Sequence, residues 1–235
     1  MTRALGAVLL LAVSGCVTAQ VAVPPAEVAT LERTLLGERR FLRSSMYQTP
    51  FFGDATKRLL TPTPPDLVRF LENPNGKPMT PGAVEKTWPV NTPVKILKVE
   101  FPSAWTMTER VLYTPRTLVW IYVELDGAAR GAAPGVIVLR PGIQSQQEFI
   151  AELDRHLSRE DLTRQLDAMN DAVRDAVKSK AALNEMTAEQ LEMAWGFPES
   201  KKIELDGAVK KETWRWGEGK RTATLVDGRV TAFTP

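Results

Sequence analysis

The sequence has little of what most active sites and metal centres are built from. Its 235 residues include one histidine and one cysteine, which excludes an intramolecular disulfide framework and a Cys-based zinc cluster of the usual spacing. The 30 Lys and Arg residues nearly balance the 28 Asp and Glu residues, for a formal net charge of +2. Such a balance indicates neither a nucleic-acid partner nor a strongly acidic substrate.

Catalytic signatures are missing as well. The chain has no Walker loop, no dinucleotide fingerprint and no Gly-x-Ser-x-Gly element. His156 has no second histidine four residues away, and we interpret it as a residue at the C-terminal end of a helix, where the macrodipole favours positive charge. Asp167, Asp171 and Asp175 share one helix face, but nearby arginine and lysine residues make them ordinary salt-bridge partners. We therefore expect no catalytic residue, no metal site and no cofactor.

The N-terminus has the pattern of a processing signal. Arg3 is followed by a run of ten residues, Ala4 to Val13, that is apolar apart from one glycine. This run is too short for a membrane-spanning helix, which takes about 20 residues, and it is typical of a signal peptide. The sequence Val13-Ser14-Gly15-Cys16 follows directly. It resembles the lipobox of bacterial lipoproteins, in which the cysteine becomes the lipidated first residue of the mature chain.

This resemblance implies that residues 1–15 are removed and that Cys16 is the lipidation site, with a diacylglyceryl thioether and an N-linked acyl chain such as palmitate. Several acyl chains make a stable anchor, since each buried CH₂ contributes about 0.8 kcal/mol. Val17 and Thr18 follow without the aspartate of an inner-membrane retention signal. In a Gram-negative host the protein would therefore be anchored in the outer membrane and face the periplasm. A Gram-positive host, or an ordinary secretory signal cleaved near Ala19, is the alternative.

We expect the rest of the chain to form an α+β fold with several parts. Residues 16–45 predict a tether and a short helix with apolar side chains at helical spacing. Residues 46–142 predict a small antiparallel β domain, because ten of the 17 prolines lie between residues 50 and 102 and exclude long helices there. Short apolar runs predict strands at 94–101, 106–113, 117–125 and 136–139.

Residues 143–183 predict a helical middle. Neither glycine nor proline interrupts the chain between Gly142 and Gly196, so helices can form throughout. The apolar spacing predicts two helices before residue 183. The second has its apolar stripe over 162–177 and follows a capping box that begins at Ser158.

The C-terminal part contains several local signals for helix ends and turns. Thr187 begins a second capping box, and Gly196 followed by Pro198 predicts where that helix ends. Asp-Gly pairs at 206–207 and 227–228 predict tight hairpin turns, since type I′ turns need a positive φ at both central residues. A helix followed by hairpins is therefore expected.

These signals, with Met186 before the capping threonine and Trp214-Arg215-Trp216 on a strand, resemble the SmpA/OmlA domain of bacterial lipoproteins, the BamE-like fold. The resemblance covers residues 160–235 and shares its first helix with the helical middle. It implies a two-layer unit with helices on one face of an antiparallel sheet. Glu185 stands where the family has glycine, and Trp195 where leucine is usual.

The six tryptophans are interpreted mainly as core residues. In the C-terminal unit we expect the inward face of the sheet to carry Trp214 and Trp216 together with Ile203, Leu205 and the alanine and leucine of the next strand. Trp214 and Trp216 are also the candidate partner-binding residues, because aromatic side chains are enriched at binding hot spots.

The resemblance also bears on function, since the family is non-catalytic and its best-known members are accessory subunits of the outer-membrane β-barrel assembly machinery. We expect a lipid-anchored binding or scaffolding module that contacts the membrane through Cys16 and an envelope protein as partner, and no nucleic acid. The alternative is an envelope ligand-binding protein or enzyme with its site in the region 45–140. A deep pocket with converging polar groups favours this alternative, whereas a shallow aromatic patch favours the first hypothesis.

Overall fold

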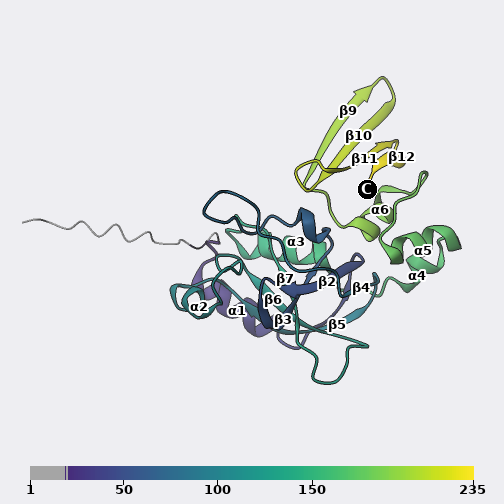
Figure 1. The fold of residues 1–235 in the computed structure, drawn as a ribbon. Helices are drawn as coiled ribbons and strands as arrows, with labels where there is room; N and C mark the ends of the chain where they lie inside the picture. The colour runs from purple at the N-terminus through teal and green to yellow at the C-terminus, as the bar shows by residue number, and fades with distance from the viewer. Residues whose placement is uncertain (1–18, 20) are drawn as a thin grey trace, which may run out of the picture.

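Two sheets of different size organise the chain (Figure 1). The computed structural model describes residue 19 and residues 21–235, so the expected signal peptide and Cys16 lie outside the described residues. Helices and strands are both present, which confirms the α+β prediction. Within the described ranges, none of the helices has the length and hydropathy that crossing a membrane would require.

The larger sheet has eight strands in the order β4-β2-β3-β7-β6-β5-β1-β8. Neighbouring strands are antiparallel except for β3 and β7, which pair in parallel. The sheet is therefore mixed, whereas we expected a purely antiparallel one. Its strands are β1 (Arg39–Leu42), β2 (Met46–Phe51), β3 (Asp54–Thr61), β4 (Lys86–Trp88), β5 (Pro93–Glu100), β6 (Trp120–Leu125), β7 (Gly135–Val138) and β8 (Leu157–Ser158).

Two helices cover one face of this sheet. They are α1 (Pro25–Leu35) and α3 (Gln146–His156). Leu31 and Leu35 of α1 and Phe149 and Leu153 of α3 are buried in the same apolar core as the sheet. The sheet unit therefore runs from the first helix to β8 and is wider than the expected domain 46–142. The sequence pattern missed β1 and β8, which lie outside residues 46–142, because both strands are too short to show an alternation of apolar and polar residues.

The segment after β5 differs from the expectation of a strand at 106–113. It forms a short helix, α2 (Ala104–Glu109), because Ser103 and Thr106 make a reciprocal capping box. The strand propensity of the β-branched and aromatic residues in this segment is smaller than the stabilisation of the helix by this cap. The strands expected at 117–125 and 136–139 are present as β6 and β7, and a single 3-10 turn, η1 (Pro65–Leu67), follows β3.

The smaller sheet and three helices form the C-terminal unit. The helices are α4 (Thr163–Asp167), α5 (Asp171–Ser179) and α6 (Ala188–Trp195), and the strands β9 (Ser200–Asp206), β10 (Val209–Trp216), β11 (Arg221–Val226) and β12 (Arg229–Thr234) form an antiparallel meander. Residues of all three helices and of β10, β11 and β12 share one core. The stripe over 162–177 is divided between α4 and α5, because the Asn170 side chain accepts a hydrogen bond from the Val173 amide and starts a new helix. Ser158 lies in β8 and caps no helix.

The expected packing of the first hairpin strand is wrong. Ile203 and Leu205 of β9 are 54% and 76% exposed. The β9–β10 hairpin extends beyond the helices (Figure 1), so the outer half of its inner face has nothing to pack against. Trp214 and Trp216, nearer the base of the hairpin, are buried as predicted.

A buried polar junction joins the two units. The Lys180 ammonium donates hydrogen bonds to the carbonyls of Ser45 at 2.6 Å and Ala194 at 2.8 Å. The Ser45 hydroxyl donates to the Val177 carbonyl and accepts from the Val90 amide. Burial, followed by repulsion from Arg221, holds the pKa of Lys180 well below its ordinary value. These buried bonds fix the C-terminal helices against the start of β2.

Candidate functional site

A cleft of about 260 Å³ lies between the two units, and we refer to it as the cleft. Its walls come from the segment 60–70 that includes the end of β3, from residues 138–141 at the end of β7, from the C-terminal half of α3, and from 197–199 between α6 and β9. The apolar part of the lining consists of three prolines and of Leu60, Leu67, Val68, Phe70, Val138 and Phe197. Residues far apart in sequence therefore form one apolar surface, part of it inside the region 45–140.

Charged groups converge on the cleft around Glu152. The Glu152 side chain is 3% exposed, and its Oε2 lies 2.6 Å from Nη2 of Arg140 and 3.6 Å from Nε of Arg155. Its other oxygen, Oε1, lies 3.6 Å from Nε2 of His156. Glu152, Arg155 and His156 lie on one face of α3 because they are spaced i, i+3 and i+4, and Arg140 reaches them from the chain after β7.

The protonation state of Glu152 follows from these contacts. Burial alone would raise its pKa, because a carboxylate loses hydration in the protein interior. The interactions with His156 and Arg140 outweigh burial and lower the pKa of Glu152 to about 2. The group is therefore an anion at neutral pH and balances part of the positive charge around it.

His156 lines the cleft and has a buried polar atom without a described partner. Its Nδ1 is buried and makes no hydrogen bond to any residue in the described part of the chain. The residue ends α3, as predicted, but its contact with Glu152 was not part of that prediction. The Glu152–His156 spacing of four residues is the one sequence signal that could have indicated this pair.

The mouth of the cleft is rich in arginine. The Arg140 side chain is 55% exposed, although one of its nitrogens contacts Glu152. The Arg155 guanidinium lies 5.4 Å from the centre of the Phe197 ring, a distance suited to a cation–π contact. The Glu199 carboxylate accepts hydrogen bonds from the amides of Gly217 and Glu218, which fixes the 197–199 wall.

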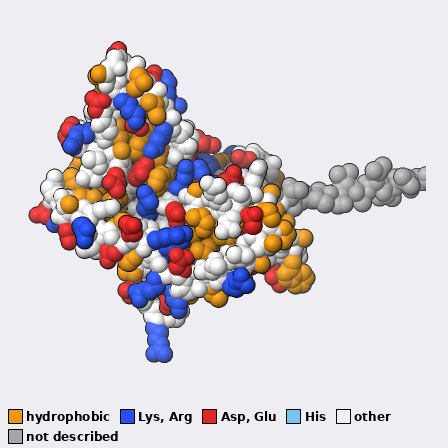
Figure 2. All heavy atoms as spheres, turned by 180° about the vertical axis from the view of Figure 1, so that it is seen from behind, with side chains coloured by type: hydrophobic (Ala, Val, Ile, Leu, Met, Phe, Trp, Pro, Cys, Tyr) orange, Lys and Arg blue, Asp and Glu red, His pale blue; other side chains and the backbone are white. Residues whose placement is uncertain are grey.

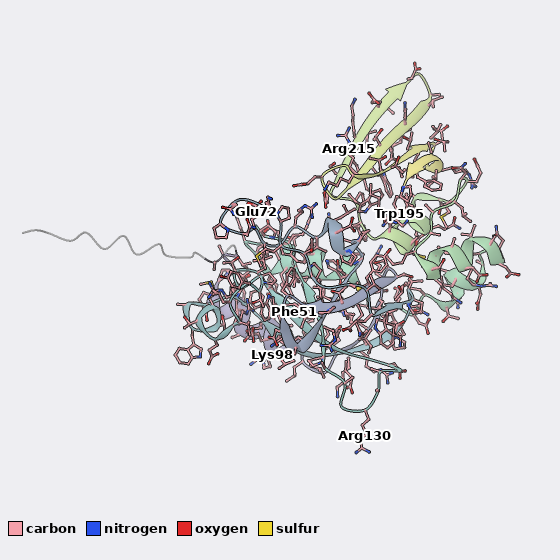
Figure 3. The ribbon with its side chains drawn as sticks, in the orientation of Figure 1. Phe51, Glu72, Lys98, Arg130, Trp195 and Arg215 are labelled. Atoms are coloured by element: carbon pink, nitrogen blue, oxygen red, sulfur yellow. The ribbon has the colours of Figure 1, made fainter. Side chains whose placement is uncertain are left out.

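The tryptophans expected to bind a partner lie elsewhere. Trp214 and Trp216 are 1% and 2% exposed, and their indole nitrogens donate to Glu212 Oε2 and to the Gly196 carbonyl. Trp216 also packs edge-on against Trp195, which Figure 3 places beside the C-terminal sheet. In this structure neither ring presents a surface to a partner.

Among the described residues, no group of three or more His, Cys, Asp or Glu side chains is arranged to hold a metal ion. The chain matches no family model, no curated protein and no solved structure. The lipobox and the SmpA/OmlA resemblance therefore remain predictions, and the geometry of the cleft is the basis for a function.

Proposed function

We propose that this protein is a lipid-anchored, non-catalytic binding module of the cell envelope, and that the cleft binds a protein partner. The anchor is Cys16, held in the outer membrane with the described part of the chain facing the periplasm. The observation that carries the proposal is the combination of apolar walls with arginine side chains that converge on one point of the cleft.

The cleft suits an apolar side chain next to a carboxylate. Burial of an apolar group against its apolar walls is favourable by roughly 25 cal/mol per Å² of apolar surface removed from water. Arg140 uses one nitrogen for Glu152 and keeps further N–H donors at its exposed end, since a guanidinium has five. A guanidinium pairs well with a carboxylate in two-point geometry.

The charged cluster supports binding better than catalysis. A carboxylate with a pKa of about 2 is a weak general base near neutral pH and holds no proton to act as a general acid. Both arginines lie beside one oxygen of Glu152, Oε2, and His156 lies beside the other, Oε1. The converging polar groups of the cleft and the burial of Trp214 and Trp216 favour a ligand-binding site over a shallow aromatic patch. We take the ligand to be a segment of a protein partner, which agrees with the assembly or scaffolding role that the SmpA/OmlA resemblance implies.

A site-specific photocrosslinking experiment in envelope membranes tests the proposal. We would replace Phe70, a half-buried residue of the cleft wall, by p-benzoylphenylalanine. The matched control is the same replacement at Arg130, which Figure 3 shows at the tip of the loop between β6 and β7, far from the C-terminal unit. We expect one discrete protein crosslink from position 70, absent from position 130 and strongly reduced by Arg140→Gln.

Equal crosslinks from positions 70 and 130, or a crosslink at 70 that Arg140→Gln leaves unchanged, would contradict the proposal. The first result would show contact without preference for the cleft. The second would show that the arginine takes no part in recognition.

A further inference from the structure

A second apolar surface lies far from the cleft, on the segment between β5 and β6. Trp105 on α2 is 71% exposed, and Val111, Leu112 and Tyr113 after α2 are also exposed. We call these four residues the apolar loop patch. The other five tryptophans are all buried, none more than 6% exposed, so an exposed indole at this position calls for an explanation.

The segment is firmly held from beneath. The buried Arg110 guanidinium donates hydrogen bonds to Oε1 and the carbonyl of Glu100 and to the carbonyls of Arg116 and Leu118. It also lies 3.8 Å from the centre of the Trp120 ring. These contacts, together with the cap at the start of α2, specify the conformation of the segment. The exposure of the apolar side chains therefore follows from a fixed backbone conformation of this segment.

The apolar loop patch lies on the side of the molecule where the described chain begins. Val21 pairs with Ile143, just before α3, and the Phe149 ring of α3 lies 5.1 Å from the ring of Phe101, which precedes α2. Figure 1 shows α2 and the start of the described chain on the same side, with the C-terminal unit on the opposite side. Figure 2, which views the molecule from behind, shows hydrophobic side chains on this same side, at the right of the picture.

We propose that the apolar loop patch inserts into the interfacial region of the bilayer beside the lipid anchor. The proposal rests on lipidation of Cys16. The five residue-to-residue steps from Cys16 to Val21 span at most about 18 Å when fully extended, so the anchor keeps this side of the protein close to the membrane. Tryptophan and tyrosine favour the membrane–water interface, where one end of the ring is apolar and the other is hydrated.

Insertion of the patch would orient the protein. With α2 in the interface, the C-terminal unit would point away from the bilayer, as the arrangement in Figure 1 implies. A lipid anchor alone leaves the protein free to rotate about its tether. A second contact, several side chains wide, removes that freedom and presents the junction of the two units to the periplasm.

Tryptophan quenching by brominated lipid tests the proposal with the lipidated full-length protein. The protein is reconstituted into phosphatidylcholine vesicles with and without brominated acyl chains, and the emission of the wild type is compared with that of Trp105→Phe. The difference between the two is the Trp105 component. We expect brominated lipid to quench most of this component and its emission to be blue-shifted relative to the protein in detergent.

A Trp105 component that brominated lipid leaves unquenched, while aqueous acrylamide still quenches it, would overturn the proposal and leave the patch to a protein partner or a second copy. The assay separates this failure from failure of the anchor. If the protein proves soluble and carries no lipid, vesicles are added to it instead. Quenching of Trp105 would then still support the patch as a membrane contact, and no quenching would overturn it.

Discussion

Replacement of Glu152 by glutamine measures how much the negative charge of this residue contributes to the folding stability through its contacts in the cleft. Glutamine has the shape of the protonated acid but carries no charge, so Glu152→Gln mimics a protonated Glu152 at any pH. The contacts lower the pKa of this carboxyl from its ordinary 4.5 to about 2. A difference of that size corresponds to roughly 3 kcal/mol of folding free energy at neutral pH.

The pH dependence has a definite sign. Because the pKa is lower in the folded state, the stabilisation is fully present above pH 4.5 and is lost as the pH falls from there toward 2. Urea denaturation at pH 7, 4 and 3 checks this. At pH 7 we expect Glu152→Gln to lower the free energy of unfolding by about 3 kcal/mol, and the gap to the wild type to shrink steadily as the pH falls.

Glu124→Gln is the matched control, since Glu124 lies exposed on β6 and forms no salt bridge with a described residue. We expect its effect to stay within about 0.5 kcal/mol at every pH, as for most surface substitutions. A Glu152→Gln protein as stable as the wild type at pH 7, or one with the same stability gap at pH 7 and pH 3, would refute the reasoning.

Two further predictions concern the core and the anchor. Trp214→Ala should lower the free energy of unfolding by about 3 to 5 kcal/mol because the ring is buried. Leu205→Ala, on the exposed hairpin, should change it by less than about 0.5 kcal/mol. Equal denaturation curves for the two variants would disprove the packing of Trp214 against the helices. Cys16→Ser should move the protein from the membrane to the soluble or precursor fraction, measured by fractionation and by the mass of the lipid. A wild-type protein that is soluble, unlipidated and cleaved near Ala19 would contradict the anchor.

The parts of the fold that could be predicted from the sequence depend on local interactions. The capping box at Thr187 is present, with its side chain accepting from the Gln190 amide, and the helix ends at Gly196 with a φ of +83°. Asp227-Gly228 joins β11 and β12 with a positive φ at both residues, as expected. In the β9–β10 hairpin only Gly207 of the Asp206-Gly207 pair has a positive φ, because Asp206 is the last residue of β9 and pairs with Val209. Each of these features is decided by residues within a few positions of each other, so the sequence pattern is sufficient.

Long-range packing decided the features that were missed. Residues 106–113 have the composition of a strand, but the Ser103 cap and the buried Arg110 bonds hold them in another conformation. The cleft was missed for a similar reason. Arg140 meets Glu152 only because β7 and α3 pack in the same unit, and no spacing in the sequence reports that contact.

The central claim, that the cleft binds an apolar group next to a carboxylate, can be tested through the only histidine of the chain. In a protein without a histidine tag, the ¹⁵N-imidazole NMR signals belong to His156 alone and report directly on the cleft. The probe is N-acetylphenylalanine at fixed pH, with its neutral amide as the control ligand and Arg130→Gln as the control variant. The account predicts a saturable shift of the His156 signals with the acid, a much smaller shift with the amide, and loss of the response in Arg140→Gln. Unmoved signals at saturating acid, or equal shifts with acid and amide, would contradict it.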